Sequence, residues 1–526
     1  MDEDVPKIYL PLLAVSDPER ESTKVRICLD AKRKFNGVSF NDFLLNGRLE
    51  MSDIFQVFTV FRSGDIAIQG DIKKMFWQIL LSDYDQQFHG IIYKGKTYVF
   101  TRVCFGDKPS PMIADSCMRL IAAEEKEQFP EGSDVICKKR FVDDLLDSGI
   151  SHSRMIQKRD ETSQLLGKYG FEVKEWLSNR KNIGRVKENG NVLGMIWDGV
   201  QDVLSVRIKE GKELLKAFTK RIVLKNIAGV WDPLGLLCGL LVIGKLIFQS
   251  MVRMQVTWDE MIKDDELAQK WQQWLEELDK CDGFCMPRSI LPSKGAITDM
   301  NFEIVGCGDG SSVAYGGAVY IRWYDENEKN VELKFIGAKA KLNPIKGTTV
   351  PRSELCGTLK TAQLVHSAEK ALQKTEIDDK LKEKIILSDS TTVISWVKSA
   401  SIKYKPFVKN KVMKCQELHP VHVWDYIPGK ENEAADLISK GCKHKDLDRI
   451  LKGPEMLYLP RKEWTKLPEK VNEEEIEVEK CASLQVNAAI LDDSCIDEKQ
   501  YHSWNSPRDC TRDCICVEIC KTASKA

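Results

Sequence analysis

The chain has 526 residues, enough for three or four domains of roughly 150 residues each. Hydrophobic residues make up 43% and charged residues 30%, which excludes collagen-like and wholly disordered classes. The 78 lysines and arginines balance the 79 aspartates and glutamates, and a net charge of −1 excludes a uniformly basic nucleic-acid binder. The charge is uneven, however: residues 151–250 hold 17 basic and 10 acidic side chains, and residues 469–526 hold 7 and 13. We therefore expect the body of the chain, not its end, to meet a polyanion.

Short strands and helices alternate through the first half of the chain. Alternating apolar residues predict strands over residues 25–29 and 65–71, a hairpin over residues 90–100, and a second strand pair over residues 141–150. Apolar residues at helical spacing predict helices over residues 51–61, 111–126, 154–169, 208–227 and 264–278.

A second block of alternating elements begins near residue 296. Strands are expected over residues 302–306, 316–324, 332–340 and 384–387, and helices over residues 354–373 and 391–398. The pattern weakens after residue 441, where a charge run at 473–479 and the residues beyond it are typical of a linker. The longest apolar run, residues 234–244, is too short to span a bilayer, and the acidic start has no signal-peptide pattern. We therefore expect no membrane partner.

The 17 cysteines lie mostly in apolar stretches, which predicts free thiols in a reducing, intracellular compartment. Four of them gather near the end of the chain: Cys510, Cys514, Cys516 and Cys520. Their spacing fits neither a zinc knuckle nor a zinc ribbon, so a metal site there is the weaker alternative.

Three acidic residues lie at predicted strand ends. Asp71 ends one strand, and Asp143 and Asp144 form the adjacent pair in FVDDLLDS (141–148). A tight turn at the pair would bring at least one of them beside Asp71. Carboxylates are the ligands that Mg²⁺ prefers, and two ions about 4 Å apart would activate a primer hydroxyl and stabilise a leaving pyrophosphate. The alternative is that this Asp–Asp pair is a solvated turn.

Four further acids have a comparable setting in the second block. They are Asp309 in GCGDGSS, Glu354 in PRSELCG, Asp389 in LSDSTTV and Asp436 in ENEAADLISKG. Two ions held there would activate water against an RNA phosphodiester. Each acid by itself would be an ordinary surface residue, whereas the four in this order suggest a nuclease. Ser390 or Thr391 is expected to cap the following helix.

Seven stretches, read in order, resemble the reverse transcriptase of LTR retrotransposons of the BEL/Pao group. They are YLPLLAV (9–15), VRICLDAKRKFNGVSFNDFLLNG (25–47), GDIAIQGDIKKMFWQI (64–79), VCFGDKPSP (103–111), FVDDLLDS (141–148), YGFEVKEWLSN (169–179) and LGMIWD (193–198). The resemblance extends to about residue 465. It implies an α+β multidomain fold, in which a right-hand polymerase with partial fingers, palm and thumb precedes an RNase H-like α/β domain.

The resemblance also divides the chain. Residues 1–205 are expected to form N-terminally truncated fingers and the palm, residues 206–295 the thumb or connection, and residues 296–445 the RNase H-like domain. Residues 446–526 are expected to be a linker and an acidic, cysteine-containing tail without ordered structure.

The function implied is RNA-directed DNA polymerisation linked to ribonuclease H cleavage of the RNA–DNA hybrid. The partners would be an RNA template, a DNA primer, the hybrid and dNTPs, with two Mg²⁺ per active site and Mn²⁺ as the alternative ion. The protein would be cytoplasmic or within virus-like particles, by itself or as part of a larger polyprotein precursor. The rival reading is a truncated, catalytically inactive remnant that at most binds nucleic acid, and the expectation that part of the fingers and the integrase are lost favours it.

Residue by residue, the resemblance makes the seven acids metal ligands and catalytic residues. Contacts to the incoming nucleotide are assigned to Arg26 and Lys24 at the triphosphate, the Ile72 carbonyl at the metal, Phe76 as the steric gate, and the pair Phe105 and Gly106. Contacts to nucleic acid are assigned to Trp176, Lys220, Arg221 and Lys225. For the hydrophobic residues the alternative is core packing, and for the lysines it is a solvated helix face.

The residues just after the acidic pair form a motif that imitates a peptidase active site, which we call the decoy motif. Asp147–Ser148–Gly149 has the form of an aspartic-peptidase active site, but no second triplet is visible. We interpret it as part of the polymerase strand and expect no peptidase activity.

Overall fold

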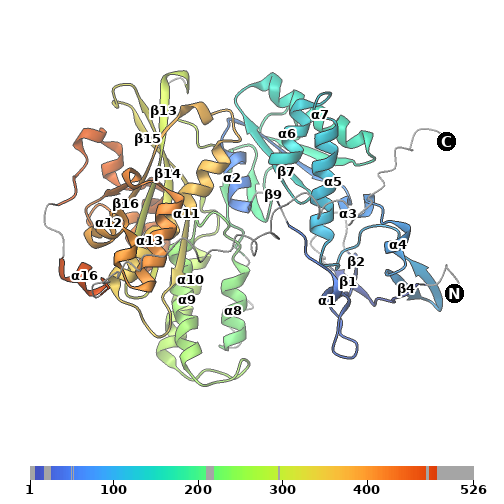
Figure 1. Ribbon diagram of the computed structural model, residues 1–526, viewed down its shortest axis with the longest axis horizontal. Coiled ribbons are helices and arrows are strands. Elements are labelled where there is room, and N and C mark those ends of the chain that lie inside the picture. Colours follow the sequence, from blue (N-terminus) through green and yellow to red (C-terminus); the bar gives the residue numbers. More distant parts are fainter. Residues whose placement is uncertain are drawn as a thin grey trace, which may run out of the picture.

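The computed structural model describes residues 6–16, 25–48, 50, 53–208, 218–293, 297–468 and 473–481. Two lobes lie side by side, each built around a sheet with helices packed on it (Figure 1). Expectations that concern Lys24 and residues 482–526, with their four clustered cysteines, lie outside the described residues.

The palm sheet of the first lobe is antiparallel, with strand order β6–β7–β3–β8. Its strands are β3 (Ile66–Ile72), β6 (Arg140–Phe141), β7 (Asp144–Gly149) and β8 (Val173–Ser178). The helices packed around it are α2 (Ile54–Arg62), α5 (Ser110–Glu124), α6 (Pro130–Lys138) and α7 (His152–Lys168). Side chains alternate across β3: Ile66 and Ile68 pack towards Met155 of α7, and Ala67 packs in the core that contains α2. The sheet is therefore covered by helices on both faces.

Two hairpins and three short helices extend this lobe. The strands are β1 (Leu12–Ser16), β2 (Val25–Leu29), β4 (Gly90–Tyr93) and β5 (Lys96–Val99). The helices are α1 (Phe40–Phe43), α3 (Met75–Gln78) and α4 (Asp83–Gln86). The expected hairpin over residues 90–100 is confirmed, and its turn uses positive φ at Lys94 and Gly95.

Between the lobes lies a small antiparallel sheet of order β12–β11–β10–β9. Its strands are β9 (Gly190–Val192), β10 (Met195–Asp198), β11 (Val203–Ser205) and β12 (Cys285–Pro287). The helices α8 (Lys220–Gly229), α9 (Cys238–Arg253) and α10 (Asp265–Asp279) belong to the same part of the chain. The helix expected over residues 208–227 is described only from Lys220 onward.

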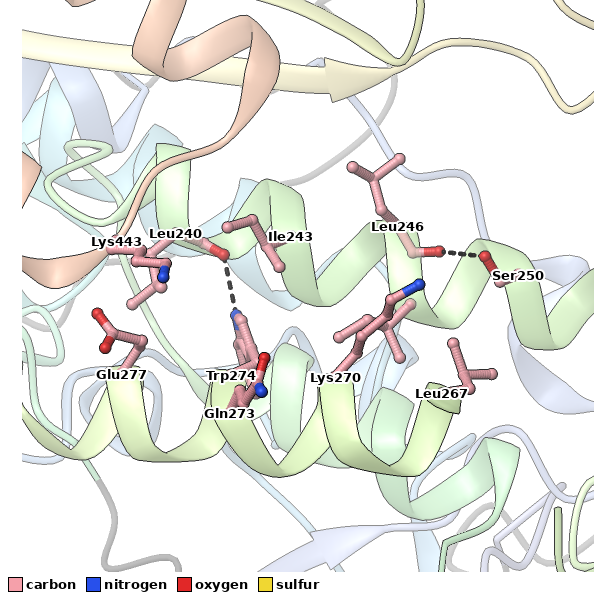
Figure 2. Close-up of a pocket in the computed structure, with 11 residues that line it drawn as sticks. Leu240, Ile243, Leu246, Ser250, Leu267, Lys270, Gln273, Trp274, Glu277 and Lys443 are labelled. Atoms are coloured by element: carbon pink, nitrogen blue, oxygen red, sulfur yellow. Dashed lines mark hydrogen bonds between the residues drawn. The ribbon is translucent and has the colours of Figure 1, made fainter. Parts of the chain in front are cut away.

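A pocket of about 280 Å³ lies between α9 and α10 (Figure 2). Five of its eleven lining residues are leucine or isoleucine, and the indole N–H of Trp274 donates to the Leu240 carbonyl at 2.9 Å. Glu277 is the one carboxylate in its lining. This pocket therefore lacks a metal-binding set and is separate from the acidic clusters described below.

The second lobe is built on a five-stranded sheet of order β15–β14–β13–β16–β17. Its strands are β13 (Met300–Gly310), β14 (Ala314–Asp325), β15 (Val331–Leu342), β16 (Leu381–Ser388) and β17 (Trp424–Tyr426). Strands β13, β14 and β15 are antiparallel, whereas β16 is parallel to both β13 and β17. The helices are α11 (Val350–Leu372), α12 (Thr391–Lys398), α13 (Pro406–Leu418) and α14 (Glu433–Lys440).

One hydrophobic core runs from α2 through α8, α9 and α10 into the second lobe. The expected division at residues 295–296 is therefore not a boundary between separate cores. Arg62 of α2 strengthens the junction, because its guanidinium donates to the carbonyls of Arg288, Phe335 and Ile336. In the part of the chain that the structure describes, no helix is both long enough and apolar enough to cross a membrane.

The segment just after residue 446 is folded, which corrects the expectation of a linker there. It contains α15 (Leu447–Lys452) and two short 3₁₀ helices, η7 (Glu455–Tyr458) and η8 (Arg461–Glu463). Arg322, fully buried in β14, donates to the carbonyls of Leu457 and Leu459 at 2.8 Å. The segment is irregular and rich in proline, so it has no periodic pattern, but its apolar residues fill the core. Beyond it, α16 (Glu473–Val478) packs against the same lobe.

Two candidate active sites

Asp71 and Asp144 lie directly opposite each other where β3 ends and β7 begins. The Val142–Asp143 turn precedes β7, and Val142 takes a left-handed conformation with φ of 53°. The amide of Ile72 donates to the Asp143 carbonyl at 2.9 Å, which ties the turn to β3. The tight turn thus places the adjacent acids at the same sheet edge as Asp71.

The carboxyl of Asp144 carries the clearest electrostatic signature of this edge. Burial, which contributes most, and the neighbouring charges of Asp143 and Asp71 together raise its pKa to about 7. Asp71 and Asp144 border a pocket of about 190 Å³ whose lining also holds Lys174 and Lys187. Grouped carboxylates that repel one another are a set suited to a divalent cation.

Four residues assigned to nucleotide contact are grouped beside the palm sheet. The rings of Phe76 and Phe105 meet edge to face at 4.9 Å, and the guanidinium of Arg26 lies 5.7 Å from the Phe105 ring centre. The amide of Leu29 donates to the Phe105 carbonyl at 2.8 Å. Gly106 has φ of 117°, and a Cβ there would come within 1.9 Å of the Leu29 carbonyl oxygen, so only glycine fits.

Two other assigned residues pack into the palm. The side chain of Ile72 is fully buried, which leaves only its backbone for the assigned role. The indole of Trp176 donates to Ser163 Oγ at 2.9 Å, and its ring covers Gly70, where an added Cβ would lie 2.9 Å away. The role of Trp176 at the primer stays a prediction.

The assignment of Lys220 to nucleic-acid contact is wrong in this structure. Its side chain is buried, and the ammonium donates to the carbonyls of Met254 and Val256 at 2.9 and 2.7 Å, just beyond the end of α9. A cation at a helix C-terminus satisfies carbonyls that lack helical partners. Arg221 pairs with Asp259 in a fully exposed position, and Lys225 is exposed, so both stay available for the role predicted.

The second acidic cluster lies at the edge of the five-stranded sheet. Carboxylate oxygens of Asp309 in β13, Asp389 after β16 and Asp436 in α14 all lie within 4.8 Å of one another. Glu354, in the second turn of α11, is outside this trio but close enough to Asp309 for the Asp309 charge to raise the pKa of Glu354. Ser390 Oγ contacts both this cluster and the start of α12. It forms a hydrogen bond with Glu354, and it accepts a hydrogen bond from the Val393 amide as the N-cap of α12. The expected cap is confirmed.

Burial and mutual repulsion shift the pKa values in this cluster upward. Burial, then the charges of Asp309 and Glu354, raises the pKa of Asp389 to about 7. Burial, together with the Asp309 charge, also raises the pKa of Glu354 to about 7. Asp389 Oδ1 is buried and has no hydrogen-bond partner among the residues described. A buried orphan oxygen beside two other carboxylates fits the ligand set of a divalent cation.

Two residues of α14 complete the cluster and were not predicted. Ser439 is fully buried and donates to Asp309 Oδ2, and Lys440 pairs with Asp436 at 2.7 Å. Lys440 is four residues after Asp436 and Ser439 three residues after it, the spacing that places side chains on neighbouring parts of one helix face. That spacing was the available signal.

The decoy motif is part of the palm sheet, as expected. Asp147 is buried within β7 and pairs with Lys139 and Lys158 at 3.1 and 3.0 Å. Its carboxylate is therefore occupied by structural ion pairs.

Comparisons with known proteins agree with this architecture. Residues 50–181 match the family described as reverse transcriptase (RNA-dependent DNA polymerase), and residues 219–390 match the Pao retrotransposon-like RNaseH-like domain. No curated protein matches the chain.

A foamy viral protease–reverse transcriptase in complex with double-stranded DNA is similar in fold, with 13% identity, a TM-score of 0.51, and coverage of 81% of this chain and 66% of that one. The foamy viral protein in complex with an RNA/DNA hybrid gives 13% identity, a TM-score of 0.50, and coverage of 81% and 51%.

The chain therefore spans about half to two thirds of the length of these structures. A palm with paired strand-end acids, followed by an RNase H-like lobe, defines a reverse transcriptase–ribonuclease H protein. Residues 219–390 thus form a domain of the Pao retrotransposon-like type, and residues 50–181 form a reverse transcriptase domain.

Proposed function

We propose that this chain polymerises DNA on an RNA template and cleaves the RNA of the resulting hybrid. The observation that carries the proposal is the presence of two separate carboxylate clusters, each at a sheet edge and each with pKa values raised by burial and like charge. Carboxylate clusters that hold two metal ions catalyse reactions at phosphorus, so two such clusters on one chain fit two separate reactions of this kind.

At the palm, Asp71, Asp143 and Asp144 would hold the metal ions, with Mg²⁺ first and Mn²⁺ as the alternative. Bound ions there supply activation of the primer hydroxyl and charge stabilisation at the leaving pyrophosphate. Arg26 would face the triphosphate of the incoming dNTP, since its guanidinium is placed beside the Phe105 ring. Phe76, packed against Phe105, would close the space at the sugar 2′ position.

At the second site, Asp309, Glu354, Asp389 and Asp436 would hold the ions. These supply activation of water and stabilisation of the charge on the cleaved phosphodiester. The hydrogen bonds from Ser439 to Asp309 and between Ser390 and Glu354 would hold these two carboxylates in place. The substrate would be the RNA strand of an RNA–DNA hybrid, distinguished from DNA by its 2′-hydroxyls.

The partners proposed are an RNA template, a DNA primer, their hybrid and dNTPs. The foamy viral proteins of similar fold are seen in complex with double-stranded DNA and with an RNA/DNA hybrid, which supports nucleic acid as the partner class. We also propose a reducing compartment, the cytoplasm or a virus-like particle, and release from a larger precursor. Free buried thiols such as Cys104, Cys238 and Cys307 support a reducing environment.

Primer extension on an oligo(dT)-primed RNA template with Mg²⁺ tests the polymerase. Extension by the native chain that disappears in D143N/D144N would establish it. Cleavage of a labelled RNA–DNA hybrid that disappears in D309N would establish the nuclease. Absence of both activities in folded protein would overturn the proposal and favour the inactive remnant.

A further inference from the structure

An acidic segment docks on the second lobe close to the nuclease cluster. We call residues 473–481, with the sequence EEEIEVEKC, the acidic strap. It contains α16, which lies at the edge of this lobe (Figure 1), and it pairs through its backbone with residues 403–405. The Lys405 amide donates to the Glu479 carbonyl at 2.8 Å, and the Cys481 amide donates to the Lys403 carbonyl at 2.9 Å. The Lys405 ammonium donates to the Val478 carbonyl at 2.6 Å. Backbone pairing therefore fixes the strap in a defined register.

Two glutamates of the strap bind donors that flank the nuclease acids. The Glu479 carboxylate is buried and accepts two hydrogen bonds from the Arg352 guanidinium at 2.7 and 3.0 Å. Arg352 lies two residues before Glu354. On the other side, Thr392 Oγ donates to Glu475 at 2.8 Å, and Thr392 lies three residues after Asp389.

A guanidinium that binds a carboxylate through two nitrogens presents the geometry that also fits a phosphate. An RNA strand whose phosphodiester lies at Asp309 and Asp389 would carry its neighbouring phosphates towards the first turns of α11 and α12, which hold Arg352 and Thr392. Both donors are occupied by strap carboxylates in this structure. The strap and a nucleic-acid backbone thus compete for the same groups.

The negative charge of the strap also opposes binding of nucleic acid. The strap carries five glutamates and one lysine, and Glu475 lies close enough to Glu354 to raise the pKa of that carboxyl. A docked strap therefore adds negative charge to a cluster that already holds four acids, which repels an approaching polyanion.

We propose that the acidic strap covers the phosphate-binding donors Arg352 and Thr392 of the nuclease site, and that an RNA–DNA hybrid must displace it to be cleaved. This inference rests on the proposed nuclease function and assigns its regulation to a segment of the same chain. In the free protein, the fraction of molecules ready to bind hybrid is then reduced by the fraction with the strap docked.

Kinetics of hybrid cleavage by the full chain test this inference. E475Q/E479Q removes the two carboxylates that bind Thr392 and Arg352, and E473Q/E474Q removes two exposed carboxylates of the same strap. We expect E475Q/E479Q to lower KM for the hybrid by roughly 3- to 10-fold with little change in kcat. E473Q/E474Q should leave KM within about twofold of the native value. Equal effects of the two variants, or none, would overturn the inference while the nuclease itself stands.

Hydrogen exchange of the native full chain gives a readout that does not depend on cleavage. An RNA–DNA hybrid added in Ca²⁺ should speed exchange in peptides that cover residues 473–481 and 403–405, because the backbone bonds at Lys405 and Cys481 are released. Unchanged or slower exchange with bound hybrid would overturn the inference. Faster exchange in a protein that cleaves no hybrid would leave the strap competition standing and would remove the proposed nuclease activity instead.

Discussion

Asp71 and Asp144 face each other across the antiparallel pair of β3 and β7, and the turn before β7 brings Asp143 to the same edge. Directly opposite residues in such a pair have Cβ atoms about 5 Å apart, so two ionised carboxylates there repel strongly when no cation lies between them. Burial is the main cause of the raised pKa of Asp144, and the charges of Asp143 and Asp71 add to it in the same direction. This arrangement favours binding of cations and yields a first prediction.

Asp144→Asn should abolish primer extension, by roughly 10³-fold or more, because one metal ligand is lost. The same change should leave the metal-free protein as stable as the native chain or more stable by about 1 kcal/mol, since it removes a buried carboxyl from a group of like charges. Urea unfolding without metal measures the second effect. Asp65→Asn is the matched control, since Asp65 precedes β3 and makes an exposed pair with Arg180. Loss of extension in the control, or strong destabilisation by Asp144→Asn, would contradict this account.

The two sites should fail independently. Asp389→Asn replaces one carboxylate oxygen of the second cluster by an amide nitrogen and removes the negative charge, so hybrid cleavage should fall by roughly 10³-fold or more while primer extension persists. Calorimetry with Mg²⁺ should show loss of binding at one site only. A simultaneous loss of extension in correctly folded protein would argue against two separate catalytic centres.

The pH dependence of stability should reflect the carboxyls whose pKa values are raised. Asp144, Glu354 and Asp389 have pKa values of about 7 in the folded, metal-free protein, against ordinary values near 4 when unfolded. Between these values the folded state binds more protons than the unfolded state, so the free energy of unfolding should fall as pH rises from about 4.5 to about 7. Stabilisation by Mg²⁺ should show the opposite trend, because the ligands must be deprotonated, and should be larger at pH 8 than at pH 6. Thermal melts with EDTA and with Mg²⁺ across this range measure both trends, and a metal-free protein that gains stability as pH rises through this window would refute the prediction.

Five of the seven predicted acids lie beside short apolar runs typical of strands, whereas Glu354 and Asp436 lie in the helices α11 and α14. Their catalytic roles stay a prediction. Asp71 and Asp309 are the penultimate residues of β3 and β13, Asp389 directly follows β16, and the tight turn before β7 has few conformations available. Lys220 was misplaced because a helical charge stripe does not show which cation meets the end of a neighbouring helix. Ser439 was overlooked because its spacing from Asp436 does not show that its hydroxyl donates to Asp309, which is 130 residues away in sequence.

The folded segment after residue 446 shows a different limit of sequence reasoning. Its stabilising contacts come from Arg322, more than a hundred residues earlier, whose guanidinium also pairs with Glu303 at 3.2 Å and lies 5.3 Å from the centre of the Trp464 ring. Such long-range bonds to irregular backbone have no periodicity for a sequence to display. They can be tested by mutation.

Arg322→Met should destabilise the second lobe by about 3–5 kcal/mol, because it leaves Glu303 buried without its partner and removes the donors to the Leu457 and Leu459 carbonyls. Residues 453–464 should then become susceptible to protease in the native state, which limited proteolysis with mass spectrometry detects. Lys329→Met, at an exposed turn after β14, is the matched control and should change stability by less than about 0.5 kcal/mol. The contradicting result would be an Arg322→Met variant that unfolds at the same denaturant concentration as the native chain and keeps residues 453–464 protected. Apolar packing of Leu457 and Trp464, not the buried guanidinium, would then hold this segment to the lobe.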